Sequence, residues 1–346
     1  MQIRKATPAD APAIAAIAES VRYQPHTADP KRGYLVFVGT PQEYAARLQG
    51  NNTSYVAELD GQVVAFLLTS FSSEDTATHT EGAAVMERIF GQGALLVDQI
   101  GVGAAATGLG AAQQLHQKML SDVAPERMTA CIMHWPLRNQ RSIGFFEGKS
   151  GYRCIGEYHE GNGFLWGIYE RATANSLVDP RYPVGRFLYT GLANEPDFQA
   201  RIDRLAALPQ LLRAAVAALP ESKLDLAPRP GAWTARQLIH HLADGNQVMA
   251  ERVRLILTEE IPLVKTFDEN TWAELEDARL APVEDSLRIL DGVHARLARL
   301  LRSTPISLLE REMMHPEQGL VKLDRLLSYL DWHGRHHTAQ ILSMAP

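Results

Sequence analysis

The sequence predicts two domains of different fold class, an α/β domain followed by an all-α four-helix bundle. The chain has 346 residues, which exceeds one ordinary domain. Before residue 173 short strand-like runs alternate with helical segments, whereas after residue 180 long helices rich in alanine, leucine and arginine dominate. The stretch 173–180 is polar and contains Asp-Pro, which suits a short linker. We therefore expect domains at 1–172 and 181–346.

Composition narrows the class of protein. Hydrophobic residues make up 46% and charged residues 21% of the chain, which is typical of a globular protein with a sizeable core. A formal net charge of −6 argues against a general nucleic-acid binder. The sequence has no apolar run long enough for a membrane span and no signal-peptide pattern at its start. Two cysteines, Cys131 and Cys154, fit a reducing compartment. We expect a cytoplasmic protein that acts on small molecules, binds neither nucleic acid nor membranes, and could form a homodimer.

The first half begins with a strand at 2–5 and a helix at 9–18. A hairpin follows at 54–68, where Asp60-Gly61 supplies a two-residue turn. The strand 95–102 leads through a small-residue loop into a helix that runs to residue 120. A helix that begins directly after such a loop presents free backbone N–H groups to an anion, and glycines let the backbone approach it closely. A lone Gly-x-Gly turn is a weak signal, since many helices begin in this way.

The order of these elements resembles the GNAT acetyltransferase superfamily over residues 1–172. The resemblance implies a mixed, mostly antiparallel sheet with flanking helices, and acetyl-CoA bound with its pantetheine along the strand 95–102. The family's pyrophosphate loop follows a strand that ends here in Val102, and a later signature begins at Asn139. Carried over by motif, the cofactor contacts are Val102, Thr107, Gly108, Gly110, Ala112 and Asn139.

Two positions depart from that family's pattern. Thr107 replaces the usual Arg or Gln, and Phe146 stands where a tyrosine often gives a proton to the departing CoA thiolate. Tyr152 is the candidate to fill that role. Asp98 and Glu87 are candidates to deprotonate the attacking amine. The alternative for Asp98 is a polar residue on an exposed face of the sheet.

The second half contains four helical segments, at about 196–219, 234–260, 284–303 and 321–343, with prolines between them. Helices of this length form a bundle, and metal sites in bundles are built from side chains that project into the core. We expect the stretch 261–282 to cross one end of the bundle. Its Lys265, Asp268, Glu269 and Trp272 could roof a site there. The alternative is a solvated loop that Trp272 anchors.

A histidine pair in the last segment indicates either part of a metal site or a polar helix end with clustered histidines. His333 and His337 are four residues apart, so on a helix they share one face. His241 follows the apolar rhythm of its own helix and is expected to face the interior, which makes three ligands and leaves a metal with an open position. His336 lies about 100° round the helix and would not share that point.

Two residues near His241, namely His240 and Asp244, each have two alternative roles. His240 is one step off the apolar rhythm, so we expect it to face outward or to pack at an edge. Asp244, three residues after His241, could accept a hydrogen bond from an imidazole and orient it, or could be a surface residue.

Residues 181–341 resemble the DinB superfamily, in its YfiT-like branch of metal-dependent hydrolases that are also described as bacillithiol S-transferases. The matching motifs are Arg181-Tyr182-Pro183-Val184-Gly185-Arg186-Phe187, Arg229-Pro230-Gly231, the segment from Trp233 to Asp244, His315-Pro316-Glu317 and the segment from Trp332 to Ala339. The resemblance implies a divalent metal, zinc or nickel, held by His241, His333 and His337. The chain departs from the family pattern at Gly245-Asn246 and at Gln340.

Such a metal supports two chemistries. It can activate water for hydrolysis, or it can bind a thiol as the nucleophilic thiolate for S-transfer. No cysteine lies in the second half, so a thiol would come from a cofactor such as bacillithiol. We therefore expect a bifunctional fusion of an acetyl-CoA-dependent N-acetyltransferase with a metal-dependent hydrolase or thiol transferase. The alternatives are a single-activity metalloenzyme with a decayed acetyltransferase-like module, and a non-enzymatic stress or interaction protein with a structural metal.

Overall fold

The computed structural model describes residues 1–71, 85, 89–90, 93–123, 125, 127–171, 179, 181–229 and 231–345. The chain divides into two compact units, one of Met1–Glu160 and Leu165–Val178 and the other of Gly161–Phe164 and Asp179–Pro346. The division falls within the predicted linker, most of which lies outside the described residues, as does Glu87. No helix among the described residues is long and apolar enough to cross a membrane.

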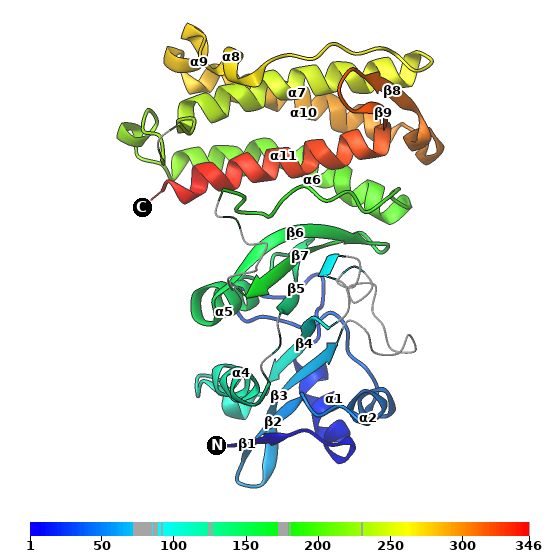
Figure 1. The fold of residues 1–346 in the computed structure, drawn as a ribbon, viewed down its shortest axis with the longest axis vertical. Coiled ribbons are helices and arrows are strands. Elements are labelled where there is room, and N and C mark those ends of the chain that lie inside the picture. The colour runs from blue at the N-terminus through cyan, green and yellow to red at the C-terminus, as the bar shows by residue number, and fades with distance from the viewer. Residues whose placement is uncertain are drawn as a thin grey trace. The chain divides into compact units, whose positions relative to one another are not determined.

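The first unit is built on a seven-stranded sheet in the order β1-β2-β3-β4-β5-β7-β6 (Figure 1). Its strands are β1 (Gln2–Lys5), β2 (Tyr55–Leu59), β3 (Gln62–Phe71), β4 (Leu95–Val102), β5 (Met128–Trp135), β6 (Tyr152–Glu160) and β7 (Phe164–Arg171). The pair β4–β5 is parallel, whereas β1–β2, β2–β3, β3–β4 and β5–β7 are antiparallel. The expected mixed, mostly antiparallel sheet is therefore confirmed.

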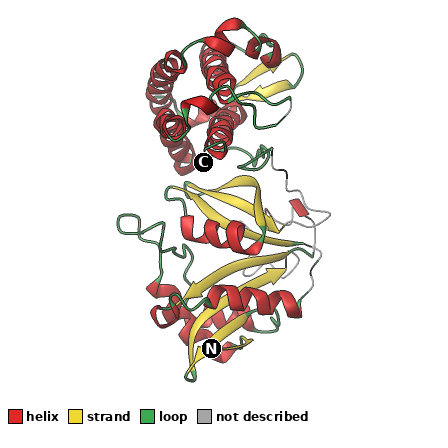
Figure 2. Cartoon of the chain, turned by 90° about the vertical axis from the view of Figure 1, so that its left-hand side faces the viewer, coloured by secondary structure: helices red, strands yellow, loops and turns green. Residues whose placement is uncertain are grey.

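Helices cover both faces of this sheet (Figure 2). They are α1 (Ala11–Ser20), α2 (Pro41–Leu48), α4 (Ala111–Asp122) and α5 (Gln140–Ser150). Successive strand residues point to opposite faces. Accordingly Val56 and Phe66 pack with α1 and α2, while Tyr55 and Leu67 join the core under α4 and α5. Burial on both faces explains why β2 and β3 read as continuous apolar runs.

The helix α2 was not expected from the sequence, although its start carries a local signal. Thr40 accepts a hydrogen bond from the Glu43 backbone N–H, and the Glu43 carboxylate accepts one from the Thr40 backbone N–H at 2.6 Å. This reciprocal capping box, with Pro41 at the first helical position, satisfies two of the donors that a helix start leaves free.

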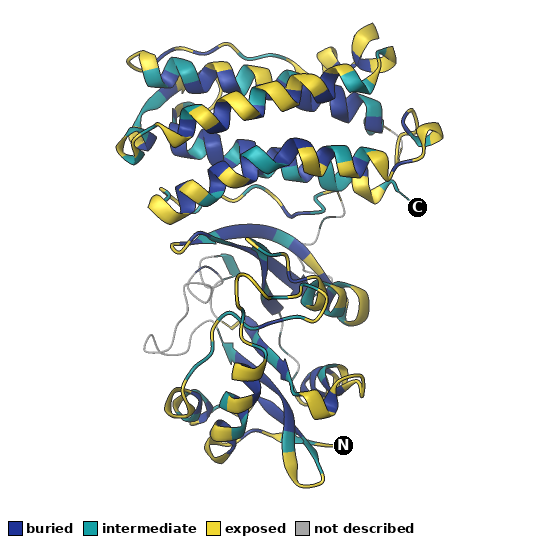
Figure 3. Cartoon of the chain, turned by 180° about the vertical axis from the view of Figure 1, so that it is seen from behind, coloured by how far each residue is buried: buried dark blue, intermediate teal, exposed yellow. Residues whose placement is uncertain are grey.

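The second unit is a four-helix bundle with a short hairpin at one end (Figure 1). Its elements are α6 (Glu195–Ala217), α7 (Ala235–Thr258), α8 (Glu269–Ala273), α9 (Glu276–Leu280), α10 (Val283–Arg302), β8 (Glu312–His315), β9 (Gly319–Lys322) and α11 (Leu323–Ser343). The four long helices match the predicted segments. The hairpin β8–β9 was not expected in a domain predicted to be all-α. The buried residues lie on the inward faces of these helices (Figure 3).

The connection 259–282 corrects one expectation. Hydrogen bonds join His240 to Ser286 and Asn246 to His294. The residue numbers increase in the same direction along both helices, so α7 and α10 are parallel. Two consecutive parallel helices need a connection that returns along their whole length, about 36 Å for a 24-residue helix. The chain therefore does not cross one end of the bundle but runs back beside α7, as Figure 1 shows.

A proline inside α6 shapes the bundle core. Pro209 has no N–H, so the carbonyl of Leu205 four residues earlier has no partner within the helix. The buried His294 of α10 supplies the missing donor, since its Nδ1 donates to that carbonyl at 2.7 Å. Pro209 thus creates an acceptor on the buried face of α6, and His294 satisfies it across the α6–α10 contact.

Candidate functional site

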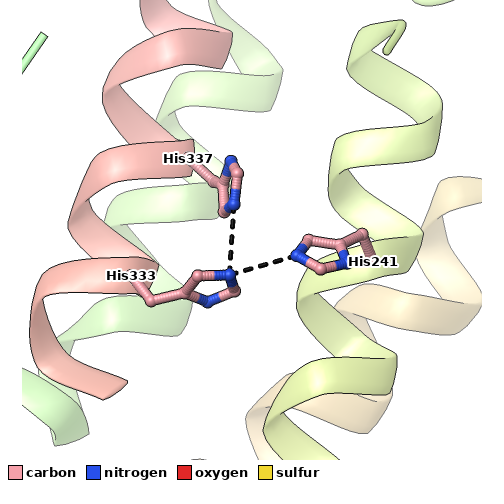
Figure 4. Close-up of side chains that lie close together, drawn as sticks. All are labelled: His241, His333 and His337. Atoms are coloured by element: carbon pink, nitrogen blue, oxygen red, sulfur yellow. Dashed lines mark hydrogen bonds between the residues drawn. The ribbon is translucent and has the colours of Figure 1, made fainter. Parts of the chain in front are cut away.

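Three histidines converge between α7 and α11 (Figure 4). The Nε2 atom of His333 lies 3.1 Å from the Nε2 of His241 and 3.1 Å from the Nε2 of His337. One nitrogen from each ring lies within 4.8 Å of the other two. His333 and His337 meet because they are one turn apart on α11, and His241 reaches them from the facing helix. The structure thus brings together all three predicted metal ligands.

The geometry of this group fits a small divalent ion. Zn–N bonds of about 2.0–2.1 Å in a tetrahedron place neighbouring nitrogens about 3.3 Å apart. Two of the observed N–N separations are 3.1 Å. His337 Nδ1 lies 2.8 Å from the Gln340 Oε1 acceptor, so this nitrogen carries the proton and Nε2 presents its lone pair to the other rings. Gln340, where the family commonly has histidine, therefore fixes the tautomer that ligation through Nε2 requires.

Burial keeps the three rings neutral at physiological pH. Removal from water lowers the pKa of His241 to about 3, with a further lowering from the charge of His337. It lowers the pKa of His337 to about 4, and that of His333 well below its usual range. A neutral imidazole is the form that binds a metal, so protons do not compete for these nitrogens near pH 7.

Aromatic rings and one glycine enclose the group. The Trp233 ring centroid lies 4.7 Å from that of His241, and Tyr329 stacks on His333 at 5.4 Å. A Cβ added at Gly245 would lie 3.8 Å from His333 Cε1, an ordinary contact distance. Position 245 therefore has room for the serine that the family favours. The tryptophan belongs to a motif recognised in the sequence, but its contact with the ligand group was not foreseen.

The neighbouring polar residues hold other positions. His336 is buried and lies outside the group of three, as its helical position predicts; its ring stacks on Trp332 at 4.7 Å and meets the edge of the His337 ring at 4.9 Å. His240 is buried rather than outward-facing, and its Nδ1 lies 2.7 Å from the Ser286 hydroxyl. That expectation was wrong because α10 covers this side of α7. Among the described residues, no hydrogen bond joins Asp244 to a histidine. Burial and the charge of Asp277 raise its pKa to about 6.

A cavity of about 610 Å³ is lined in part by Tyr329, whose ring stacks on His333; the three histidines are not among the residues that line it. Two of the predicted roof residues, Asp268 and Glu269, line this cavity. Lys265 contributes its carbonyl, which accepts a hydrogen bond from Arg252 at 2.7 Å. Trp272 packs on Phe267 with ring centroids 4.5 Å apart and so anchors α8. Within the described chain none of these four residues makes a hydrogen bond to the three histidine rings, so their role as a roof stays a prediction.

The first unit contains a cleft at its parallel strand pair. The β4–β5 register extends only over Leu95–Val97 paired with Met128–Ala130. Beyond it the cleft is lined by Asp98, Gln99 and Ile100 from one strand and by Cys131, Ile132 and Met133 from the other. Strands that stop pairing leave backbone N–H and C=O groups available to a ligand. This is where the sequence predicts the pantetheine of acetyl-CoA.

The predicted pyrophosphate loop joins β4 to α4. Val102 ends the strand, and Gly108 and Gly110 have φ of +83° and +73°, a region that side chains disfavour. Gly110 caps α4 without a side chain, and Ala112 lies in the first turn. The side chain of Thr107 turns back to the Gly103 carbonyl. The helix start is therefore free for an anion, as expected of such a loop.

Asn139 and Asp98 both line the cleft but are already engaged. The Asn139 Oδ1 caps α5 by accepting from the Ser142 N–H at 3.1 Å, and its Nδ2 donates to the Tyr34 carbonyl at 3.0 Å. Asp98 forms an ion pair with Arg47. The alternative of an exposed residue on the sheet face is wrong, since the Asp98 side chain is largely buried and paired. Its role in deprotonating the amine stays a prediction. Cofactor contact by Asn139 stays a prediction.

The general-acid candidate Tyr152 lies elsewhere. It is fully buried in the core below α4, with its hydroxyl 3.1 Å from His116 Nε2, and it does not line the cleft. Phe146 does line the cleft, together with Tyr158 and Glu160, which the sequence reading missed. Glu160 accepts a hydrogen bond from the Trp166 indole at 2.8 Å. Their spacing of two along β6, which places both on one face, was the available signal.

Comparisons with known proteins find a family match for each half of the chain. Residues 204–341 match the family model described as the DinB superfamily, and residues 19–152 match the model described as the acetyltransferase (GNAT) family. A Bacillus mycoides protein named "putative metal-dependent hydrolase" is 41% identical over 168 residues, which are 49% of this chain and 96% of that protein. A protein of the same name from Oceanobacillus iheyensis is 38% identical over 167 residues, 48% of this chain and 96% of that protein.

Solved structures match each half separately. One is YfiT from Bacillus subtilis, described as a probable metal-dependent hydrolase with an unusual four-helix bundle topology. It is 34% identical to this chain, and the match covers 48% of this chain and 96% of that one, with a TM-score of 0.47. A ribosomal-protein-alanine N-acetyltransferase from Brucella melitensis is 19% identical; the match covers 50% of this chain and 100% of that one, with a TM-score of 0.35.

Proposed function

Because the chain belongs to the DinB superfamily and carries a region that matches the GNAT family, we propose that it is a bifunctional enzyme. The second unit would be a hydrolase or a low-molecular-weight-thiol transferase that uses a divalent metal, zinc or nickel. The first unit would transfer an acetyl group from acetyl-CoA to an amine.

One observation carries the proposal for the second unit, namely the convergence of three neutral Nε2 atoms. Tyr329, which stacks on His333, also lines a cavity of ligand size. His241, His333 and His337 would hold the ion, and Gln340 would orient His337. Three protein ligands leave open positions, and an ion so bound supplies Lewis acidity that activates water or a thiol. Trp233 and Tyr329 would exclude bulk water from that side of the site and hold the two facing imidazoles in place.

Turnover by the full chain, reconstituted with one equivalent of zinc or nickel, tests this function. Hydrolysis is followed with p-nitrophenyl acetate, and S-transfer is followed as conjugation of monochlorobimane to cysteine or bacillithiol. We expect metal-dependent turnover in one of the two assays and its loss in His333→Ala. The matched control is His336→Ala, on the same helix but outside the set of three converging nitrogens. Equal rates with and without metal in both assays would contradict the proposal.

The cleft between β4 and β5 and the free start of α4 support acetyl-CoA as the cofactor of the first unit. Tyr158 and Glu160, rather than Tyr152, are the groups placed to exchange protons there. Titration calorimetry with acetyl-CoA tests the binding step. Absence of binding at millimolar ligand would contradict this half of the proposal and favour a decayed binding module, leaving the metal site unaffected.

A further inference from the structure

The cavity that Tyr329 lines, next to the ring of His333, carries hydrogen-bond donors without partners among the described residues. Its volume of about 610 Å³ is that of a small-molecule site. Apolar side chains such as Phe187, Met313 and Leu326 form part of its wall. Charged and polar groups from α7, β8 and α11 complete it. The chemistry of these polar groups indicates what the cavity binds.

Arg252 of α7 is the most informative of these groups. The residue is only 6% exposed, and its Nη2 donates to the Lys265 carbonyl at 2.7 Å. Its Nε is fully buried, and no atom in the described part of the chain accepts a hydrogen bond from it. Because Nε is enclosed by protein atoms, a ligand in the cavity that Arg252 lines would be held by the remaining N–H groups of Nη1 and Nη2.

Two further donors surround the same space. His315 of β8 is 6% exposed, and its Nδ1 accepts the backbone N–H of Glu317 at 3.2 Å. Its proton therefore lies on Nε2, for which the described residues offer no partner. Arg325 of α11 lines the cavity and likewise forms no ion pair or hydrogen bond with any described residue. Donors from three elements thus border one cavity.

The acidic side chains of the cavity form no ion-pair contact with these arginines among the described residues, although the charge of Glu269 acts on Arg252. Asp268 Oδ1 accepts the backbone N–H groups of Asn270 and Thr271 at the start of α8. Glu269 and Glu317 are exposed. Within the described chain none of the three lies within ion-pair distance of Arg252 or Arg325. These acids would repel a doubly charged phosphate more than a singly charged carboxylate, so the balance favours a monoanion.

Building on the function proposed above, we propose that Arg252, Arg325 and His315 bind the carboxylate of a small monocarboxylic substrate whose reactive bond lies at the three histidines. Guanidinium groups suit this role because their paired N–H donors match the two oxygens of a carboxylate. Arg325 precedes His333 by eight residues on α11, a rise of about 12 Å. The substrate therefore separates its carboxylate from its reactive bond by a comparable length, with its apolar part against Phe187, Met313 and Leu326.

Hexanoate and its neutral analogue hexanamide are the probes, titrated into the full metal-loaded chain by calorimetry. We expect hexanoate to bind at least tenfold more tightly than hexanamide. Arg252→Gln and, separately, Arg325→Gln should each weaken hexanoate by about tenfold or more and leave hexanamide unchanged. The matched control is Arg254→Gln on the same helix, whose guanidinium donates to its own helix at the Ala250 carbonyl and does not line the cavity. Circular dichroism establishes that each variant is folded.

The Co²⁺-substituted chain distinguishes this site from direct ligation of the metal. The proposal expects the visible spectrum of bound Co²⁺ to stay unchanged in shape when hexanoate binds. It is overturned if hexanoate binding survives both arginine substitutions, or if phosphate binds more tightly than hexanoate. It is also overturned if hexanoate alters the cobalt spectrum and its binding is lost in His333→Ala. A chain that binds hexanoate through Arg252 but takes up no metal would refute the proposed function and leave the carboxylate site standing.

Discussion

Replacing Gly334 by alanine should destabilise the second unit, although alanine is the better helix former. A Cβ at this position would lie 2.2 Å from Leu208 Cδ2 and 3.0 Å from Leu208 Cδ1. Leu208 is only 3% exposed, so its methyl groups have little room to move aside. The absence of a side chain at Gly334 therefore allows α11 to approach α6 closely.

The magnitude follows from two opposing effects. Overpacking a filled core costs about 1–3 kcal/mol, whereas the change from glycine to alanine in a helix gains about 1 kcal/mol. Gly292 in the middle of α10 is the matched control, because a Cβ there meets nothing within 4 Å. Gly292→Ala should gain about 1 kcal/mol. The two variants should thus differ by about 1–3 kcal/mol, which isolates the overpacking cost.

Urea unfolding followed by far-UV circular dichroism measures both free energies. Leu208→Ala, combined with Gly334→Ala, should remove most of the overpacking cost, so the two substitutions should be non-additive. Equal free energies of unfolding for Gly334→Ala and Gly292→Ala would refute the reasoning. Additivity of Leu208→Ala and Gly334→Ala would refute the assignment of the close contact to that leucine.

Three further predictions concern other parts of the chain. Arg201→Met should destabilise the second unit by about 3–5 kcal/mol in urea unfolding, because it leaves the buried Asp324 carboxylate without its ion-pair partner at 2.6 Å. Arg302→Met removes an exposed ion pair and should cost less than about 1 kcal/mol. Similar losses of unfolding free energy for both variants would contradict the argument. Burial, and to a lesser extent the charge of Arg171, lowers the pKa of His116 to about 4, so the folded first unit binds fewer protons than the unfolded chain between pH 6.5 and 4 and should lose stability as pH falls through that window. His116→Gln should flatten this dependence of the melting temperature on pH, and an unchanged slope would show that another group causes it. Gly110→Ala should weaken acetyl-CoA binding in calorimetry, because a residue with a side chain is strained by about 1–2 kcal/mol at a φ of +73°. Gly148→Ala in α5 should leave binding unchanged. Equal affinities for the two variants would exclude the α4 loop from the cofactor site.

Local patterns predicted much of the fold and the metal-ligand group. Apolar periodicity and proline stops located the four long helices, and the strand at 95–102 was placed correctly to the residue. His333 and His337 could be paired because helical spacing is a local property. His241 could be added because its inward direction follows from its neighbours Leu238 and Leu242.

Features that depend on distant contacts could not be read in this way. Nothing in the residues of α7 says that α10 runs parallel to it, and this direction decides where the connection 259–282 lies. The role of Pro209 depends on His294, which is 85 residues further along the chain. His240 was expected to face outward or to pack at an edge, because its own helix gives no information about the burial that α10 provides. The grouping of Arg252, His315 and Arg325 around one cavity likewise appears only when α7, β8 and α11 are packed together.

Metal content of the full chain and its histidine variants tests the central claim most directly. The chain is stripped with a chelator, reloaded with zinc or nickel, desalted and analysed by mass spectrometry for metal per chain. We predict one ion per chain for the unmodified protein and for His336→Ala, and a loss of at least tenfold in affinity for His241→Ala, His333→Ala and His337→Ala. Retention of the ion by all three ligand variants, or an equal loss in His336→Ala, would contradict the assignment of these three histidines as a metal site.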